Sequence, residues 1–434
     1  MTSLLELDRS LAAGSYYACT TSLPPVQEPL VGTVHCDVAV VGGGIAGLST
    51  AIELAQRGLS VHVLEGQRLG FGASGRNGGQ VLHSLACDLG VVERQLGADA
   101  AREVFHTTVE SIHLLQQRCA EFSIDADWQP GYVSVAVKPR KARELMDDAD
   151  ILERRYGHVQ RRISASEMPD WVNSPRYLAG VYDPLCGHIN PLKYTLGLAR
   201  AARSLGVVVH EMCPVQRLLP GETCTLRTPT GTVRAQRVVL AGNVHLHGID
   251  APLHDRVMPV ASYIIATQAL DRELVVSLVP SGAAVSDNNV VLDYFRTTPD
   301  LRMLYGGRVG FGRTPPPDYA AVMRARMVRT FPALASAHID FQWGGYVDIT
   351  MNRAPDFGRL GPHQNVYYLQ GFCGHGVALS GMAGRMVAQA IAGDAARFDV
   401  FSRLRHRPFP GGPWLRTPAL VLGMGWYRLK DALA

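Results

Sequence analysis

The stretch CDVAVVGGGIAGLSTAIELAQRGLSVHVLEGQRLGFGASGRNGGQ, residues 36–80, decides the fold of this chain. A valine-rich run opens it, and Gly42, Gly44 and Gly47 follow with the spacing G-x-G-x-x-G. Apolar residues then recur at helical spacing, and a second apolar run ends at Glu65. This order predicts a strand, a glycine turn, a helix and a second strand.

Each glycine has its own physical role in that pattern. Gly42 permits a tight turn out of the strand, Gly44 lets the backbone approach a pyrophosphate, and Gly47 lets the helix pack closely on the sheet. The phosphates then meet unpaired N–H groups at the positive end of the helix dipole. Glu65 follows about twenty residues on, where its carboxylate accepts from both ribose hydroxyls and repels a 2′-phosphate. We therefore expect an adenine dinucleotide without a 2′-phosphate, rather than a glycine turn used only for packing.

Composition and charge favour a soluble enzyme of two domains. The chain has 434 residues, of which 47% are hydrophobic and 18% charged, and its net charge is +4. This length allows two domains, and so small a charge gives no case for nucleic-acid binding. The eight cysteines show neither a C-x-x-C pair nor zinc-ligand spacing, so we predict reduced thiols and no metal site.

The ends of the chain bear on its location. The N-terminus lacks the basic-then-apolar layout of a signal peptide, and no window approaches the roughly 20 apolar residues of a membrane span. We therefore expect a cytoplasmic protein. The apolar tail, residues 413–434, carries Arg416, Arg428 and Lys430 at intervals. It is predicted to dock as a terminal helix, with peripheral membrane contact as the alternative.

A second glycine cluster at residues 70–79 selects the dinucleotide. A nicotinamide enzyme needs no second flexible turn so soon after its ribose acid, whereas a flavin ring must lie flat against backbone N–H donors. Glycines supply that close approach, and Ser74 and Asn77 supply polar contacts. The cluster therefore favours FAD, and the alternative is a mobile surface loop.

The rest of the chain alternates between two kinds of pattern. Residues 1–35 look like a lead-in, and residues 139–156 form a charged amphipathic helix pattern. At residues 187–191 the motif GHINP caps a helix and the α/β pattern returns. Residues 251–349 are strand-rich, with a helix at 317–329 as the exception. The chain thus leaves the nucleotide domain and re-enters it.

Several motifs together resemble one known family, and they are distributed along the chain as follows: GASGRNGGQ at 72–80, GHINP at 187–191, VVLAGN at 238–243, YGGR at 305–308, WGGYVDIT at 343–350 and GFCGHGVAL at 371–379. With the N-terminal unit, they resemble the D-amino-acid-oxidase-type flavoenzymes over almost the whole chain. The pattern is most similar to that of the γ-glutamylputrescine oxidases and their amine-oxidising relatives. This resemblance implies FAD-dependent oxidation of a primary or secondary amine to an imine or aldehyde, with hydride transfer to the flavin N5. It also implies reoxidation by O₂ to give H₂O₂.

The fold expected from these patterns is α/β, a Rossmann-like FAD-binding domain with a discontinuous substrate domain built on an antiparallel sheet. The predicted boundaries are 31–90, 180–250 and 350–400 for the FAD domain, 91–179 and 251–349 for the substrate domain, and 401–434 for a tail that docks on the FAD domain.

The predicted catalytic residues lie in two glycine-rich turns. The backbone around His375 opens a helix, whose N–H groups and dipole are expected to face the N1–C2=O edge of the flavin. Arg76 adds a positive charge near that edge. For His375 itself, a structural histidine that holds the turn is an equal alternative. The predicted cofactor-binding residues are Gly42, Gly44, Ile45, Ala46, Gly47, Glu65, Gly66, Gln67, Gly72, Ala73, Ser74, Arg76, Asn77, Gly78, Gly79, Gln80, Val215, Ala241, Gly242, Asn243, Gly374, His375, Gly376, Val377 and Ala378.

The attachment of the flavin and the substrate follow from departures from the family pattern. Relatives that hold their flavin covalently use a cysteine in the segment matching residues 350–357 or a histidine in the second glycine cluster, and this chain has neither, so we expect non-covalent FAD. Sarcosine oxidases place a carboxylate-binding lysine where Ala378 stands, which favours an amine without a carboxylate at its reactive end. Arg353 and Arg296 remain as partners for a more distant acid, or as structural arginines. The candidates for the substrate wall are His83, Tyr294, Arg296, Trp343, Tyr346 and Cys373, with core packing as the alternative for each aromatic residue.

Two rival functions stay open at this stage. One is a D-amino-acid or N-methyl-amino-acid dehydrogenase that passes electrons to a quinone. The other is an FAD-stabilised subunit with no turnover of its own, against which the complete glycine clusters argue.

Overall fold

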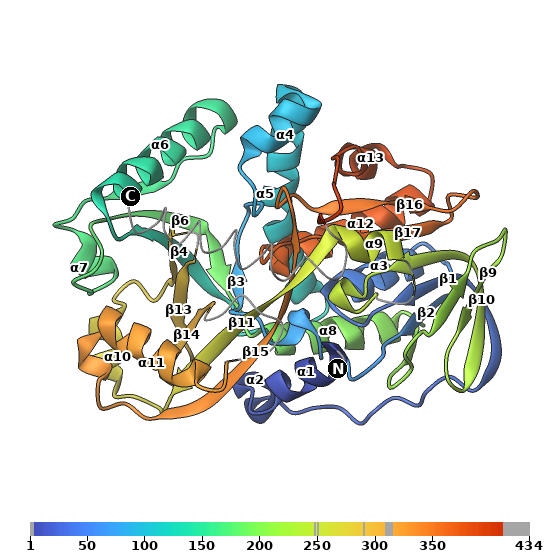
Figure 1. The fold of residues 1–434 in the computed structure, drawn as a ribbon, viewed down its shortest axis with the longest axis horizontal. Helices are drawn as coiled ribbons and strands as arrows, with labels where there is room; N and C mark the ends of the chain where they lie inside the picture. Colours follow the sequence, from blue (N-terminus) through green and yellow to red (C-terminus); the bar gives the residue numbers. More distant parts are fainter. Residues whose placement is uncertain (1–3, 247–248, 250, 290, 309–315, 411–434) are drawn as a thin grey trace.

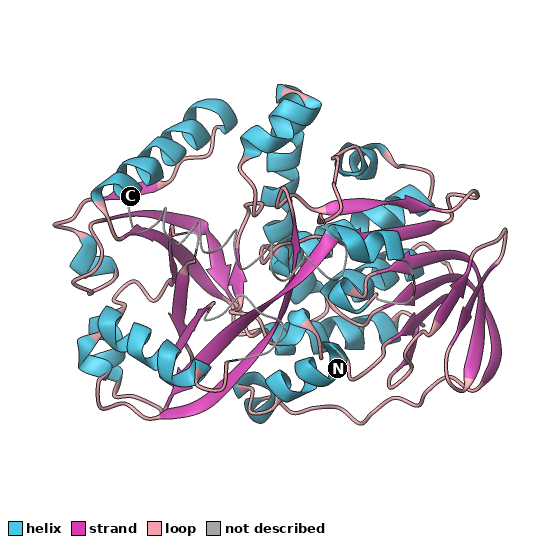
Figure 2. Cartoon of the chain, in the orientation of Figure 1, coloured by secondary structure: helices cyan, strands magenta, loops and turns pink. Residues whose placement is uncertain are grey.

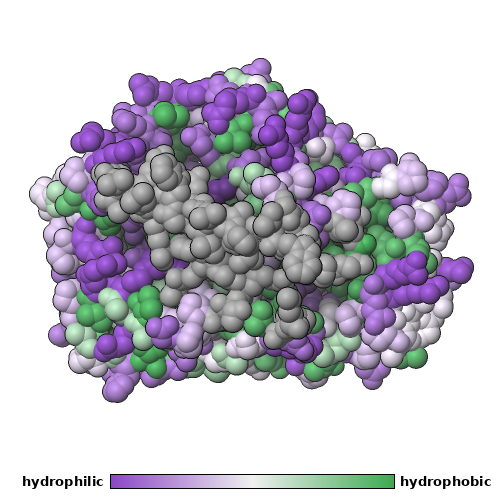
Figure 3. Space-filling view, in the orientation of Figure 1, coloured by the Kyte–Doolittle hydropathy of each residue, from purple (hydrophilic) through white to green (hydrophobic). Residues whose placement is uncertain are grey.

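The computed structural model describes the chain except for residues 1–3, 247–248, 250, 290, 309–315 and 411–434. The predicted docking of the C-terminal tail falls almost entirely outside the described residues. No helix among the residues that the structure describes is long and apolar enough to cross a membrane. On the face drawn in Figure 3, hydrophilic side chains gather over the upper part, where the ribbon in Figure 1 places α4 and α6.

An eight-stranded sheet forms one half of the molecule, on the right in Figures 1 and 2. Its central strands run parallel, and β16 pairs antiparallel at one edge. A hairpin of β8 and β9 extends it beside β10. The strands in spatial order are β16 (Asp356–Leu360), β17 (Val366–Gln370), β10 (Gly231–Leu240), β1 (Gly32–Val41), β2 (Val61–Leu64) and β7 (Val208–His210), with β8 (Arg217–Leu219) and β9 (Cys224–Arg227) off this path.

Both faces of this sheet are covered, which explains its continuous valine-rich strands. Val38 and Val40 of β1 belong to the core that includes the helices on one face, whereas Ala39 belongs to the core on the opposite face. On the second face, Leu226 of β9 and Leu253 of α9 close the core. The helices of the first face and its surroundings are α3 (Ile45–Ala55), α4 (Leu89–Leu96), α5 (Ala98–Glu121), α8 (Pro191–Ser204), α12 (Gly376–Ile391) and α13 (Ala396–Ser402).

A nine-stranded sheet forms the other half, and it is antiparallel except for the β4–β12 pair. Its strands in spatial order are β15 (Ile339–Thr350), β11 (Val257–Thr267), β14 (Met303–Gly307), β13 (Asp293–Thr297), β12 (Ala284–Asp287), β4 (Gln129–Ala136), β6 (Ala179–His188) and β3 (Gln80–Val81), with β5 (Arg161–Ile163) beside β6. Helices α6 (Pro139–Tyr156), α7 (Met168–Trp171), α10 (Arg272–Leu278) and α11 (Tyr319–Thr330) flank it. Along β11, Tyr263 and Ile265 enter the core of this half, and Ile264 enters the core that includes the helices on the first face of the eight-stranded sheet.

Several local predictions are confirmed. The helix predicted at 139–156 is α6, and the GHINP motif caps α8, because the Asn190 side chain accepts from the N–H of Lys193. The predicted α/β class with a parallel-rich sheet and an antiparallel-rich sheet is also confirmed.

Other segments differ from the sequence pattern. The supposed lead-in contains α1 (Leu4–Ala12) and α2 (Tyr16–Thr20), and α9 (Ala251–Arg256) and α10 interrupt the strand-rich region besides the expected helix. Strands β3 and β6 pair in the nine-stranded sheet, although the predicted boundaries put their residues in the FAD domain. By their strand pairing, β3 and β6 belong to the nine-stranded sheet. The domain boundaries given above stay a prediction.

Three small-residue turns lie at one edge of the eight-stranded sheet. They follow the carboxyl ends of β1, β10 and β17, which are neighbours in the order β17–β10–β1. Ligands of open α/β sheets bind at such an edge. The register brings the three turns together although they come from distant parts of the sequence.

Candidate active site

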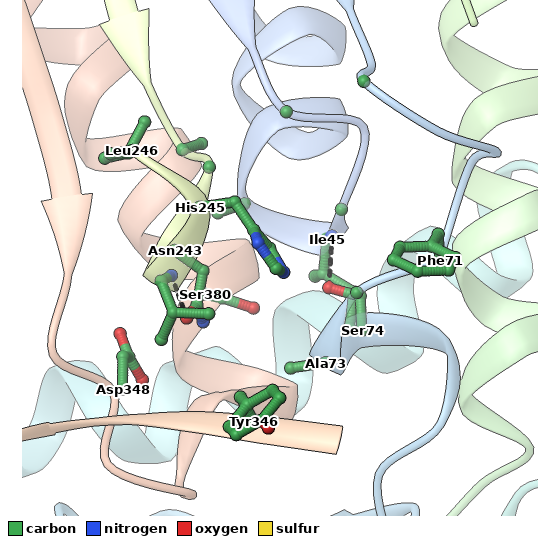
Figure 4. A pocket seen from close by; sticks show the side chains of 18 of the residues that line it. Ile45, Phe71, Ala73, Ser74, Asn243, His245, Leu246, Tyr346, Asp348 and Ser380 are labelled. Atoms are coloured by element: carbon green, nitrogen blue, oxygen red, sulfur yellow. Dashed lines mark hydrogen bonds between the residues drawn. The ribbon is translucent and has the colours of Figure 1, made fainter. Parts of the chain in front are cut away.

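A cavity of about 260 Å³ lies at this edge of the sheet. Figure 4 shows side chains that surround it, among them Ile45, Ser74, Asn243, Tyr346 and Ser380. The turn after β1, the end of β2, the second glycine cluster and the start of α12 all contribute to the lining. The segments that the sequence motifs singled out thus meet around one space.

The start of α3 forms one wall of this cavity. Gly44 is its N-cap and has no side chain to cap the helix, but the Ser74 Oγ accepts from the N–H of Ile45 at 3.0 Å. The other N–H groups of the first turn have no acceptor within the helix. A Cβ on Gly42, whose φ is +110°, would lie 2.6 Å from the Ala241 oxygen. The wall therefore offers free amide donors to a phosphate and leaves no room for a side chain at Gly42.

Glu65 lies at the end of β2 and lines the same cavity. Its Oε2 accepts from the N–H of Gly43 at 2.7 Å, and its Oε1 accepts from the N–H of Gln67 at 2.8 Å. Burial raises the pKa of the carboxyl group, and the two backbone N–H groups oppose that shift. Each carboxylate oxygen has a second lone pair. The arrangement fits a carboxylate that accepts from the two hydroxyls of a ribose.

A buried ion pair braces the second glycine cluster. The Arg76 Nη2 lies 2.7 Å from the Asp8 Oδ2, and the side chains are only 4% and 1% exposed. The Arg76 Nη1 also donates to the backbone oxygens of Asp8 and Gly344, and its guanidinium lies over the Phe71 ring. Burial lowers the pKa of Arg76, and Asp8 counteracts that shift. The charge predicted to face the flavin is thus already balanced by an acid from the N-terminal helix.

Asp8 also carries a polar atom that fits a bound cofactor. It lines the cavity, and its Oδ1 is buried without a hydrogen-bond partner among the described residues. The Nε2 of His245, which projects toward the cavity in Figure 4, lies 2.9 Å from the Asp8 Oδ2. Free amides at α3, a ribose-ready carboxylate and an unpartnered acceptor together match the donors and acceptors of a dinucleotide with several hydroxyls.

A second cavity, of about 170 Å³, shares a wall with the first. The residues that line both are Ala73, Asn77, Tyr346, Val347, Gly374 and Val377. Beyond that wall the second cavity is bounded by the nine-stranded sheet, through Ile264, Ser286 and Tyr294 among others. A ligand in one cavity is therefore in contact with the wall of the other.

His375 is the N-cap of α12 and lines the second cavity. Burial, together with the positive charge of Arg353, lowers its pKa to about 4, so the imidazole is neutral at pH 7. Its Nδ1 is buried without a hydrogen-bond partner in the described part of the chain. Asp348 holds the turn before it by accepting from the N–H groups of Gly371, Phe372 and Cys373, and burial raises the pKa of Asp348 to about 6.

The structure brings most of the predicted residues together. Of the predicted cofactor-binding residues, those that line the first cavity are Gly42, Gly44, Ile45, Ala46, Glu65, Gly66, Gln67, Gly72, Ala73, Ser74, Asn77, Val215, Ala241, Gly242, Asn243, Gly374, Gly376 and Val377. The predicted residues that line the second cavity without lining the first are Arg76, Gly78, Gln80, Tyr294, Cys373 and His375. The remaining predicted residues that line neither cavity in the described structure are Gly47, Gly79, His83, Arg296, Trp343 and Ala378.

Two of the proposed substrate-wall residues, Arg296 and Trp343, line neither cavity and make structural contacts. Arg296 donates to the Gly78 and Ile189 oxygens and to the Tyr17 hydroxyl. Trp343 is 0% exposed, and its Nε1 donates to the Arg76 oxygen at 2.9 Å. Both side chains donate hydrogen bonds to backbone oxygens of the second glycine cluster and so support it from outside the cavities. Sequence alone does not reveal these contacts.

His83 lies in a separate buried cluster. Its Nε2 is 2.8 Å from the Asp183 Oδ2, which His158 and Gln160 also contact. The ring nitrogens of both histidines and the amide of Gln160 thus converge on a single carboxylate oxygen. The pKa of Asp183 is lowered, with burial opposing the shift and the hydrogen bonds from His158 and His83 driving it.

Among the residues that sequence reasoning did not single out for the site are the charged residues Asp8, Asp348 and Arg308. Asp8 lies in the segment interpreted as a lead-in, and no local pattern links it to Arg76. Asp348 and Arg308 fall inside the quoted motifs WGGYVDIT and YGGR, so position in a motif at the end of a strand was the one signal available.

Comparison with known proteins identifies the family. The sequence profile described as "FAD dependent oxidoreductase", the DAO family, matches residues 37–390. The chain belongs to this family. It is an FAD-dependent oxidoreductase, and the residues around the first cavity fit that cofactor.

The relatives of this DAO-family oxidoreductase extend over nearly its whole length. Gamma-glutamylputrescine oxidoreductase of Escherichia coli (strain K12) is 40% identical over 421 residues, which cover 96% of this chain and 98% of the relative. A probable oxidoreductase named OrdL from Haemophilus influenzae is 36% identical over 423 residues, covering 96% of this chain and 97% of the relative. The solved structure of glycine oxidase from Bacillus cereus matches with a TM-score of 0.69 at 21% identity, covering 86% of this chain and 99% of that chain. At that identity the last similarity shows the fold alone.

Proposed function

We propose that the chain oxidises an amine of the γ-glutamylputrescine type and passes the electrons to O₂. The amine loses two electrons and two protons to become an imine, and O₂ takes up these electrons and protons as H₂O₂. Water then hydrolyses the imine to an aldehyde and ammonia. The observation that supports this most is the wall shared by the two cavities, because it sets a substrate-sized space against the FAD site. The similarity to gamma-glutamylputrescine oxidoreductase supports the choice of amine.

The residues of the first cavity would hold FAD. We assign the ribose to Glu65, the phosphates to the free N–H groups at the start of α3, and the flavin edge to the N–H groups that begin α12. When bound, FAD supplies the acceptor, N5, for a hydride from the carbon beside the amine.

The chain's own residues position the amine and keep it reactive. Leu82, Ile264 and Leu292 give the second cavity an apolar wall that excludes water. The unpartnered Nδ1 of the neutral His375 is available to accept from a substrate N–H. No general base is required, because an amine that arrives neutral gives up its hydride directly.

FAD is proposed to be bound without a covalent link. Cys373, the cysteine in the cavity lining, is buried, and burial beside Asp348 raises the pKa of its thiol to about 12. A protonated thiol is a poor nucleophile toward the flavin. Precipitation of the holoprotein in acid should leave the yellow colour in the supernatant, and colour that stays with the pellet would contradict this assignment.

An anaerobic flavin-reduction screen tests the activity. γ-Glutamylputrescine should bleach the flavin band at about 450 nm, whereas D- and L-amino acids and N-methyl amines should bleach it slowly or not at all. If only amino acids bleach it, the proposed substrate is wrong.

The electron acceptor needs its own measurement. Under air, O₂ uptake and H₂O₂ formation should match the amine consumed. Reduced flavin that reacts slowly with O₂ but rapidly with a soluble quinone would favour the alternative, a dehydrogenase of D-amino or N-methyl amino acids.

A further inference from the structure

Arg308 is the least compensated charge around the second cavity. It directly follows β14 and lines the cavity. Arg326 fixes its backbone, because the Arg326 Nη1 donates to the Arg308 oxygen at 2.8 Å. Among the described residues, no carboxylate pairs with the Arg308 guanidinium.

A second arginine adds to this positive charge. Arg353 follows β15, and no carboxylate of the described chain forms an ion pair with it either. Burial, followed by the charge of Arg353, lowers the pKa of Arg308 to about 10, so the Arg308 guanidinium is charged at pH 7. Asp348, which lines the first cavity, is already engaged by the N–H groups of the turn after β17.

The buried arginines elsewhere in the described structure have partners. Arg76 pairs with Asp8, Arg118 pairs with Glu53, and Arg296 donates to three oxygens. Arg308 is half-buried at the cavity wall, and a cation partly withdrawn from water without an anion is unfavourable. A ligand that carries an anionic group into this cavity would supply the partner that the Arg308 guanidinium lacks.

We propose that Arg308, with support from Arg353, binds a carboxylate carried by the amine substrate. This inference rests on the proposed function, and it specifies the group of the substrate, its carboxylate, that the enzyme recognises. The same positive charge repels an ammonium group, so it selects amines that carry an acid over simple diamines. It also favours the neutral form of the reacting amine, which is the form that donates a hydride.

A matched pair of substrates tests the assignment. γ-Glutamylputrescine and its analogue without the carboxylate, N-(4-aminobutyl)-4-aminobutanamide, differ only in the group in question. The wild-type enzyme should prefer the acid by about 100-fold in kcat/KM, since a charged hydrogen bond in a buried site commonly contributes a factor of this order. Arg308→Gln should lose at least about 30-fold of that preference, mainly through KM, and Arg308→Lys should retain part of it.

Control variants separate recognition from a general defect. Arg161→Gln, at an exposed arginine on β5, should keep the wild-type preference. Arg353→Gln should lose less of it than Arg308→Gln. If Arg308→Gln lowers kcat/KM equally for both substrates, or leaves their ratio unchanged, the assignment is wrong.

A binding measurement works without turnover. Glutarate, a dicarboxylate without an amine, should perturb the visible spectrum of the bound flavin and raise the thermal midpoint of the wild-type holoenzyme. Its dissociation constant should rise at least about tenfold in Arg308→Gln, and Arg308→Lys and Arg353→Gln supply the same comparison if that variant fails to fold. Glutarate that binds all variants equally, or does not bind the wild type, overturns the proposal. An enzyme that binds glutarate through Arg308 but oxidises no amine would instead disprove the proposed function alone.

Discussion

The two cavities are adjacent, but they are built in different ways. The first is rich in glycines, which come from turns at the carboxyl ends of parallel strands and from the starts of α3 and α12. The second is made largely of side chains from the nine-stranded sheet, such as Tyr132, Tyr294 and Arg308. A site made of backbone needs glycines at fixed spacing, and that spacing is visible in the sequence. A site made of side chains depends on which distant strands pair, and that is visible only in the fold.

The largest effect is expected from a substitution that disrupts the first cavity. A Cβ at Gly47 would lie 2.0 Å from the Gly42 oxygen, so Gly47→Val must displace the turn that faces the phosphates. The variant should purify without FAD, as measured by its ratio of absorbance at about 450 nm to that of the protein. Gln56→Ala, at an exposed position after the same helix, should keep the wild-type FAD content. A yellow Gly47→Val protein would show that the backbone of this cavity tolerates rearrangement.

An intermediate effect should reach both cavities through one ion pair. Asp8 lines the first cavity and Arg76 lines the second, so Asp8→Ala leaves a buried guanidinium unpaired. The free energy of unfolding should fall by about 3–5 kcal/mol, as measured by urea titration of the holoenzyme. Asp99→Ala removes an exposed ion pair with Arg102 and should leave the urea midpoint unchanged. A small loss for Asp8→Ala would mean that water or the cofactor replaces the carboxylate.

The smallest effect concerns pH and the second cavity. Burial lowers the pKa of His375 from 6.5 to about 4, so the folded protein binds fewer protons at this group than the unfolded chain between these values. Stability should therefore be lost as the pH falls from about 6.5 toward 4. His375→Asn should reduce the difference in unfolding free energy between neutral and acid pH by up to about 3 kcal/mol.

The comparison for this prediction is urea titration of both proteins at a series of pH values. An unchanged dependence on pH would mean that His375 is solvated or charged in the folded state. Buried His188, whose pKa burial lowers to about 3, should still cause acid sensitivity in both proteins.

Sequence reasoning predicted several elements well because their signals are local. The helix 139–156 matches α6 at both ends, and the Asn190 cap is made by the expected side-chain contact. Gly42, Gly44 and Glu65 all face the cavity that the pattern predicted. In each case, residues within one turn of a helix or one strand end determine the geometry.

Two of the predicted residues that line neither cavity owe their positions to long-range contacts. Trp343 and Arg296 have the chemistry of substrate-binding residues, but their partners in the second glycine cluster and α2 are far away in the sequence, and these partners bury them. Asp8 was missed for the same reason. Arg308 was not singled out because arginine is abundant in this chain, and only its lack of a carboxylate partner distinguishes it.

The order of strands in the eight-stranded sheet has a consequence for synthesis and folding. β1 ends at Val41, but its neighbour β10 begins at Gly231, and β17, beyond β10, begins at Val366. Pairings between such distant segments close slowly, because a long loop must be ordered before any contact stabilises it. A ribosome must therefore make nearly the whole chain before the turn after β17 joins the other two. FAD therefore binds late in folding, because the site is incomplete until the turn after β17 has joined the turns after β1 and β10.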